Sequence, residues 1–121
     1  MELTKDNSNN NNFIKNYENH IVYIGNSVYK KNIIISRRKI DVWNIIGIES
    51  LSIDDFSLIL DLNPEIVIVG TGDKFLSPNP EILYNLNNNN IGLEYMITES
   101  ACKTFNVLLS ENRNVVAALY L

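Results

Sequence analysis

The sequence predicts an α/β fold with a largely parallel central sheet that is covered on both faces. The clearest observation is the run Ile66–Val69, in which four consecutive β-branched apolar residues show no polar alternation. Such a run is typical of a parallel strand that is buried on both sides. The second observation is the order of the expected elements, because the second half alternates helix and strand whereas the first half is mostly strand. The length of 121 residues and the 45% hydrophobic content fit one domain with its own core.

The N-terminal half begins with a polar segment and continues with strand patterns. Residues 1–12 end in four asparagines and carry too little apolar area to offset the entropy of ordering, so we expect a loose tail before a single domain over residues 13–121. Short apolar runs predict strands at 13–17, 21–24 and 28–35. The turn signal Gly25-Asn26 predicts that the last two strands form an N-terminal hairpin.

The segment from Arg37 to Gly47 is ambiguous, with Trp43 among scattered apolar residues. We expect Trp43 to be a partly buried anchor whose indole N–H finds a backbone acceptor. The alternative is a binding role for this side chain.

The remaining elements include about three helices with recognisable ends. Ser52 opens the first helix and Pro64 ends it, Asn79-Pro80 opens the second, and Thr98 opens the third. Asn112 can adopt the left-handed conformation that stops the third helix. Strands are expected at 66–69, 93–97 and 115–121. The last strand is apolar enough to be central in the sheet, although an edge strand that pairs with a second copy is the alternative.

Composition excludes several classes of function. The net charge of -4 disfavours nucleic-acid binding, and the basic clusters Lys30-Lys31 and Arg37–Lys39 are expected to face solvent. One cysteine and one histidine are too few for a structural zinc site, so we expect no metal and no cofactor. No apolar run reaches the roughly 20 residues that cross a bilayer. The N-terminus lacks a targeting pattern, which favours the cytoplasm, with the mitochondrial matrix as the alternative if a presequence is missing.

The Gly70-Thr71-Gly72 loop follows the buried strand, at the edge of the sheet where α/β proteins tend to bind ligands. It does not match a dinucleotide fingerprint, because Phe75 stands where the third glycine is needed. If the strand 93–97 is parallel to 66–69, Thr98 shares this edge with Thr71. We therefore predict that a ligand or partner site is drawn from the loop and the third helix, with these residues: Gly70, Thr71, Gly72, Asp73, Thr98, Lys103, Asn106 and Arg113. For Thr98, Asn106, Glu111 and Arg113, on or beside the third helix, the sequence favours interior hydrogen bonds that lock helix to sheet over a ligand or partner site.

Cys102 lies near the start of the third helix, where the helix dipole could favour a thiolate. A catalytic cysteine also needs a base, and His20 lies in the hairpin region with no motif around it. We expect Cys102 to be a small buried apolar residue. No catalytic residue is predicted, because the carboxylates show no acid–base spacing.

Several short motifs occur in series: Pro64-Glu65, Gly70–Gly72, Gly92–Thr98, Ala101–Asn106, Leu108–Arg113 and Val116–Leu119. Their order and spacing resemble the small-domain family that contains mitochondrial complex I assembly factor 3 and the adipogenesis-associated domain proteins. The resemblance covers about residues 13–121. The family typically has Asp, Arg and Tyr where this chain has Ile97, Lys103 and Phe105.

The resemblance implies a three-layer α/β fold with a mixed central sheet and no established enzymatic activity. Eukaryotic members help to assemble the membrane-bound NADH dehydrogenase beside a partner protein. The leading hypothesis is therefore a non-enzymatic interaction or assembly module, linked to respiratory complex assembly or membrane-protein biogenesis, with an unidentified protein partner and peripheral membrane association as an option. The alternative is a small-molecule or anion site, or an unrecognised enzyme, at the Gly70-Thr71-Gly72 edge. Both a monomer and a homodimer are compatible with the sequence.

Overall fold

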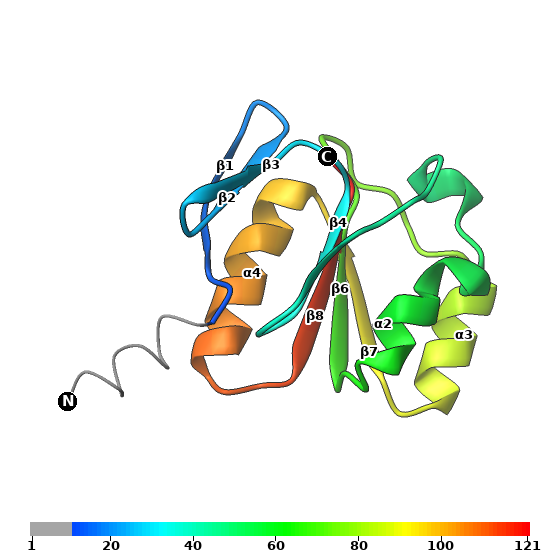
Figure 1. Ribbon diagram of the computed structural model, residues 1–121. Helices are drawn as coiled ribbons and strands as arrows, with labels where there is room; N and C mark the ends of the chain where they lie inside the picture. The colour runs from blue at the N-terminus through cyan, green and yellow to red at the C-terminus, as the bar shows by residue number, and fades with distance from the viewer. Residues whose placement is uncertain (1–10) are drawn as a thin grey trace.

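The computed structural model describes residues 11–121 and has three layers. A five-stranded sheet forms the middle layer, with α4 (Thr98–Ser110) on one face and α2 (Ser57–Asp61) and α3 (Pro80–Asn88) on the other. A smaller three-stranded sheet lies over α4, so that this helix is enclosed between two sheets (Figure 1). The predicted fold class is confirmed.

The central sheet is mixed, with strand order β5-β4-β8-β6-β7. Its strands are β4 (Ile33–Ile35), β5 (Ile40–Val42), β6 (Ile66–Gly70), β7 (Gly92–Met96) and β8 (Val115–Leu119). β6 is parallel to both β7 and β8, whereas β4 is antiparallel to β8 and to β5. β8 is therefore a central strand, and the alternative of an edge strand at the C-terminus is wrong.

The small sheet consists of β1 (Ile14–Glu18), β2 (Ile21–Ile24) and β3 (Ser27–Tyr29), all antiparallel. The predicted hairpin is confirmed for β2 and β3. The single strand expected over 28–35 is wrong, because the chain leaves the small sheet after Tyr29 and enters the central sheet at Ile33. The polar Lys30-Lys31-Asn32 segment interrupts the apolar run at this crossing.

Capping residues fix the starts of the first two predicted helices. The carboxylate of Asp55 accepts the Ser52 N–H at 2.9 Å, and the Asn79 side chain accepts the Glu81 N–H at 2.8 Å. The third helix begins at Thr98 as predicted, but the expected cap is wrong, because Ile97 is its N-cap and no side chain makes a capping hydrogen bond there. The first predicted helix is shorter than expected, because the residues after Ser52 form a 3₁₀ turn, Ile53–Phe56, before α2 begins. Asn112 has a positive φ of 65° after α4, as predicted.

Two hydrophobic clusters cover the two faces of the central sheet. The first cluster lies between the central sheet, α4 and the small sheet, and it includes Phe105. The second cluster lies between the central sheet and the helices α2 and α3, and it includes Phe56. Trp43 belongs to the second cluster, and its indole N–H donates to the Asp55 carbonyl at 2.9 Å. The expected anchoring role of Trp43 is confirmed.

Two further observations concern membrane-spanning helices and the start of the described chain. Within residues 11–121, no helix is both long and apolar enough to cross a bilayer. Residues 1–10 of the expected tail lie outside the described residues, and Asn12 donates hydrogen bonds to the Ser36 and Arg37 carbonyls at 3.0 and 2.9 Å.

Candidate functional site

A threonine lock joins the Gly70–Gly72 loop to the start of α4. The Thr98 hydroxyl accepts the Gly72 N–H at 2.8 Å and donates to the Tyr120 carbonyl at 2.7 Å. The Thr98 N–H donates to the Gly72 carbonyl at 3.0 Å, and Thr98 is 0% exposed. Since β6 and β7 are parallel, their carboxyl ends meet at this edge, as the sequence predicted. We define the threonine lock as Gly70, Gly72, Thr98 and Tyr120.

The glycine at position 70 is required by close packing rather than by an unusual backbone angle. A Cβ placed on Gly70 would lie 2.9 Å from the Thr98 hydroxyl oxygen and 3.1 Å from a Leu119 methyl carbon. Gly72 differs, because its φ of +92° strains any other residue. The Thr71 hydroxyl donates to the Lys74 carbonyl at 2.6 Å, which closes the loop on itself. Hydrogen bonds therefore tie the loop both to α4 and to itself.

Exposed side chains extend from the locked loop. Asp73 lies 3.6 Å from the Nε2 atom of His20, whose Nδ1 atom lies 2.7 Å from the Leu121 carbonyl oxygen. Phe75 is 58% exposed, as single apolar side chains on protein surfaces often are. Sequence reasoning did not place His20 or Phe75 at this edge. The available sequence signal for His20 was the preceding Asn19, because asparagine tolerates the positive φ that both residues adopt in this turn. Phe75 carried no such signal.

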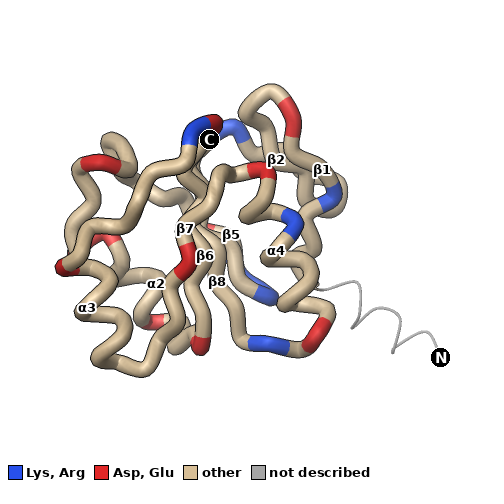
Figure 2. Tube along the Cα trace, turned by 180° about the vertical axis from the view of Figure 1, so that it is seen from behind, with Lys and Arg blue, Asp and Glu red and all other residues tan. Residues whose placement is uncertain are grey.

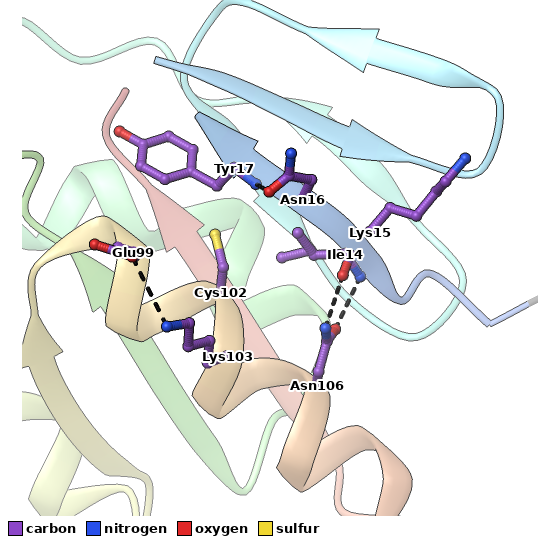
Figure 3. Close-up of a pocket in the computed structure, with 8 residues that line it drawn as sticks. All are labelled: Ile14, Lys15, Asn16, Tyr17, Glu99, Cys102, Lys103 and Asn106. Atoms are coloured by element: carbon purple, nitrogen blue, oxygen red, sulfur yellow. Dashed lines mark hydrogen bonds and ion pairs between the residues drawn. The ribbon is translucent and has the colours of Figure 1, made fainter. Parts of the chain in front are cut away.

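Lys103 and Asn106 lie further along α4 and line a cavity of about 180 Å³ between α4 and β1 (Figure 3). Asn106 pairs with Ile14 through two hydrogen bonds of 2.8 Å, in which the amide both donates to the carbonyl and accepts the N–H. Lys103 is exposed and lies 3.8 Å from Glu99. The Tyr17 hydroxyl at this cavity has no hydrogen-bond partner among the described residues.

Cys102 also lines this cavity and is buried. Burial, assisted by the negative charge of Glu99, raises the pKa of the thiol to about 12. The thiol therefore stays protonated near neutral pH, which does not suit a nucleophile. The structure supports the expectation of a small buried apolar residue. Among residues 11–121, no three His, Cys, Asp or Glu side chains gather closely enough to hold a metal ion.

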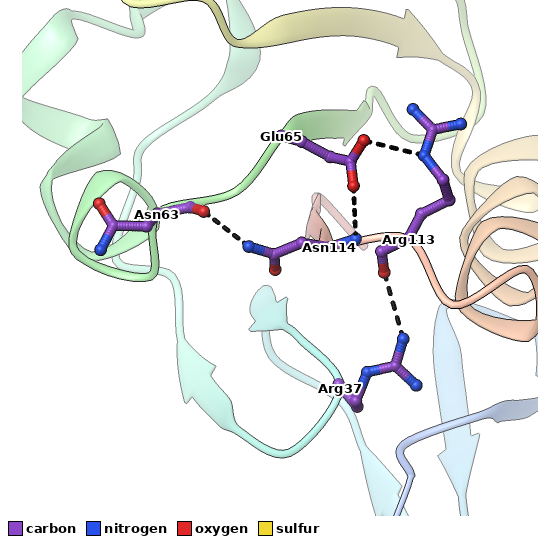
Figure 4. A network of polar contacts seen from close by, with 5 residues as sticks. All are labelled: Arg37, Asn63, Glu65, Arg113 and Asn114. Atoms are coloured by element: carbon purple, nitrogen blue, oxygen red, sulfur yellow. Dashed lines mark hydrogen bonds and ion pairs between the residues drawn. The ribbon is translucent and has the colours of Figure 1, made fainter.

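Arg113 lies at the other end of the sheet, away from the remaining predicted site residues. Its Nε atom donates to the Glu65 carboxylate at 2.9 Å (Figure 4). The Asn114 N–H, together with Arg113, holds the pKa of the Glu65 carboxyl below its usual value. The structure thus divides the predicted residues among three places: the loop with Thr98, the cavity beside β1, and the base of the sheet.

Comparison with known proteins gives two kinds of relative. A 13 kDa major membrane protein of Francisella tularensis is 34% identical over 105 residues, which is 85% of each chain. The NADH dehydrogenase 1 alpha subcomplex assembly factor 3 of Xenopus tropicalis is 38% identical over 79 residues, or 64% of this chain. That match spans only 43% of the assembly factor, less than half of its length.

Solved structures share the fold. A crystal structure of a Bordetella parapertussis protein superimposes with a TM-score of 0.85 at 25% identity, covering 91% of this chain and 95% of that one. A Bordetella pertussis protein described as a Mth938-like domain gives a TM-score of 0.79 at 21% identity, covering 90% and 85% of the two chains. The sequence model of the family described as protein of unknown function DUF498/DUF598 matches residues 14–120. The chain therefore belongs to this family, and the resemblance to complex I assembly factor 3 that the motifs indicated is confirmed.

Proposed function

We propose that the protein is a non-enzymatic interaction module of the assembly-factor type. We further propose that it binds its partner through the exposed residues His20, Asp73 and Phe75 beside the threonine lock, which we name the rim. The observation that carries this proposal is the 38% identity over 79 residues to a protein named as an assembly factor. The match covers part of that relative, so the shared domain rather than the whole relative is the basis of the proposal.

The geometry of the rim supports protein binding. The threonine lock holds the loop rigidly, which lowers the entropy that a partner must remove on binding. Phe75 is an exposed aromatic side chain, and aromatic side chains often supply most of the energy in protein interfaces. Asp73 adds an exposed carboxylate beside His20. The rim thus presents an apolar anchor with charged neighbours on a fixed backbone.

The pathway and the compartment belong to the same proposal. A link to respiratory complex assembly or membrane-protein biogenesis is supported by the names of the two relatives, one an assembly factor and the other a membrane protein. We propose a cytoplasmic location with peripheral contact to a membrane, with the mitochondrial matrix as the alternative.

Site-specific crosslinking tests the partner surface. The photoreactive residue p-benzoylphenylalanine replaces Phe75 in one bait and the exposed Tyr84 of α3 in a matched control bait. We expect a discrete protein to be crosslinked from position 75 and not from position 84, and Asp73→Lys to weaken the crosslink. The same proteins from both positions, or none from position 75, would contradict the proposal.

A small-molecule or anion site near the Gly70-Thr71-Gly72 edge is the second candidate. The observation that favours it is the cavity beside β1, which lies next to the start of α4 but is not lined by the Gly70–Gly72 loop itself. Burial first, and then the charge of Asp73, raises the pKa of its lining residue Tyr17. Lys103 supplies a cation to the lining of the same cavity, where it lies 3.8 Å from the carboxylate of Glu99. The predicted residues Lys103 and Asn106 therefore belong to a concave surface.

A thermal-shift screen of metabolites tests this candidate. A ligand at about 100 times its Kd should stabilise the protein by about 2.7 kcal/mol. We expect Cys102→Leu, which fills the cavity, to abolish the shift, and Ser110→Ala at the far end of α4 to preserve it. A shift that survives Cys102→Leu would place the ligand elsewhere.

A further inference from the structure

A concave basic surface lies at the end of the sheet opposite the threonine lock. Its first wall is the β4–β5 turn with Arg37, Arg38 and Lys39, and its second wall is the α4–β8 loop with Arg113. This open concave surface has a volume of about 440 Å³, and we name it the basic cleft. In Figure 2 the basic segments of the two walls lie close to each other at the lower end of the sheet.

The charge of the basic cleft is opposite in sign to that of the whole protein. Four of the ten Lys and Arg residues of the chain line it, and no lining residue is acidic, although the net charge is -4. Glu65 and Glu111 flank the second wall, and Glu65 is engaged by Arg113. A concave surface lined by charges of one sign attracts ligands of the other sign.

Hydrogen bonds hold the two walls together. The Nη2 atom of Arg37 donates to the Arg113 carbonyl at 3.2 Å and approaches the Leu109 carbonyl, near the end of α4, at 3.5 Å. A cation is favourable at this negative end of the helix dipole. The Asn114 side chain donates to the Asn63 carbonyl at 2.6 Å, which ties the second wall to the segment before β6 (Figure 4). The cleft is therefore preformed.

The remaining cations are available to a ligand. Arg38 and Lys39 are exposed, and their side chains make no ion pair with any residue of the described range 11–121. Leu62, which also lines the cleft and is partly buried, offers an apolar contact.

The form of the cleft suits an extended ligand rather than one small ion. One kind of phosphate site is built from free backbone N–H groups in a loop. Here the Arg113 N–H donates to the Leu108 carbonyl and the Asn114 N–H to Glu65. We propose that the basic cleft binds a carboxylate-rich peptide segment of another protein, in which an apolar side chain contacts Leu62. This inference goes beyond the proposed function, because the cleft and the Phe75 rim lie at opposite ends of the sheet.

A binding measurement on the full chain tests the proposal. The probe is a short fluorescein-labelled peptide of glutamates interspersed with leucine, followed by fluorescence anisotropy. We expect the double variant Arg38→Ala, Lys39→Ala to raise Kd about fivefold, the size expected for two exposed charge pairs. The double variant Lys30→Ala, Lys31→Ala removes the same charge from another exposed basic pair, and it should change Kd by less than about twofold because distant surface charges are screened.

Other probes decide between ligand classes. Equal loss in both double variants, or equal binding of a peptide with glutamine in place of glutamate, would overturn the proposal. So would tighter binding of inorganic phosphate or of a single-stranded oligonucleotide than of the peptide.

Amide NMR signals of the unmodified protein give a second measurement that does not depend on folding of the variants. We expect the peptide to shift signals of residues 36–39 and 112–114, and shifts confined to other regions would overturn the proposal. Crosslinking from position 75 does not involve Arg38 or Lys39, so the two proposals fail separately.

Discussion

The threonine lock and the basic cleft are built at opposite ends of the same parallel strands, yet they use hydrogen bonds differently. In the lock, the Thr98 hydroxyl is buried and uses both its donor and its acceptor capacity on the backbone. In the cleft, Arg37 and Arg113 are partly engaged, and Arg38 and Lys39 remain exposed. Burial thus separates polar groups that stabilise the fold from polar groups that can still bind a partner.

The largest expected effect is at the buried end. Thr98→Val removes the hydroxyl and leaves the Gly72 N–H and the Tyr120 carbonyl without their partner. Each buried group left unpaired costs about 1–3 kcal/mol, so for the two groups we expect a loss of roughly 2–6 kcal/mol in the free energy of unfolding. Urea denaturation measures it. Thr104→Val on the same helix is the control, because Thr104 is only partly buried and makes no side-chain hydrogen bond within residues 11–121. An equal loss of stability in both variants would show that the hydrogen bonds of the Thr98 hydroxyl are not the cause of the loss.

Gly70→Ala tests the same lock through sterics. The new methyl would lie 2.9 Å from the Thr98 hydroxyl oxygen and 3.1 Å from the Thr98 Cα atom, so either α4 or the loop must move. Overpacking of this kind costs about 1–3 kcal/mol. Thermal unfolding should show the loss, and crosslinking from position 75 should fall with it.

Gly92→Ala is the matched control for that variant. A Cβ on Gly92 would find its nearest neighbour at 3.6 Å, which is an ordinary contact. We expect it to leave stability unchanged or to raise it by about 0.5 kcal/mol, because alanine loses less backbone entropy on folding. If both glycines tolerate alanine equally, close packing at Gly70 is not the reason for its presence.

Local signals in the sequence predicted much of this architecture. Four apolar residues in series placed β6, and the capping residue Asn79 placed the start of α3. The start of α4 was also predicted at Thr98, although no side chain caps that helix. The shared edge of Thr71 and Thr98 followed from one assumption, that β6 and β7 are parallel. The partners of the Thr98 hydroxyl were not predictable, because Tyr120 reaches it only through the placement of β8 in the centre of the sheet.

The candidate sites could likewise be predicted only in part, because local sequence patterns do not show which distant segments pack together. The basic run Arg37–Lys39 was visible in the sequence and was expected to face solvent, but nothing local indicated that Arg113 would complete a concave surface. The polar Lys30-Lys31-Asn32 segment was also visible, yet only the packed structure shows that it separates two sheets. Side-chain chemistry is local, whereas concavity depends on the packing of distant segments.

An effect of intermediate size is expected at Asn106, which joins α4 to the small sheet. Asn106→Ala removes both hydrogen bonds to Ile14 at a partly buried site that water can reach. We expect a loss of about 1–2 kcal/mol and faster amide hydrogen exchange in β1 and β2 than in β6. Lys103→Ala, which removes only an exposed ion pair on the same helix, should cost less than about 0.5 kcal/mol. Uniformly faster exchange in both sheets would contradict a local joining role.

The smallest expected effect is at the exposed end and depends on pH. The pKa of Glu65 is lowered in the folded protein from its ordinary value of 4.5, chiefly by the Asn114 N–H and next by Arg113. A lowered pKa contributes stability that is present above pH 4.5 and lost as the pH falls through the folded value. We expect Glu65→Gln to be slightly less stable than the wild type near pH 7 and to converge with it in acid. Glu94→Gln, at an exposed carboxylate of β7 that makes no ion pair within residues 11–121, is the control for removing one negative charge from the surface. The basic cleft should keep its affinity for the glutamate peptide in Glu65→Gln, because this change leaves Arg38 and Lys39 in place. A fall in affinity would show that the Glu65–Arg113 pair, rather than the exposed cations, shapes the binding surface.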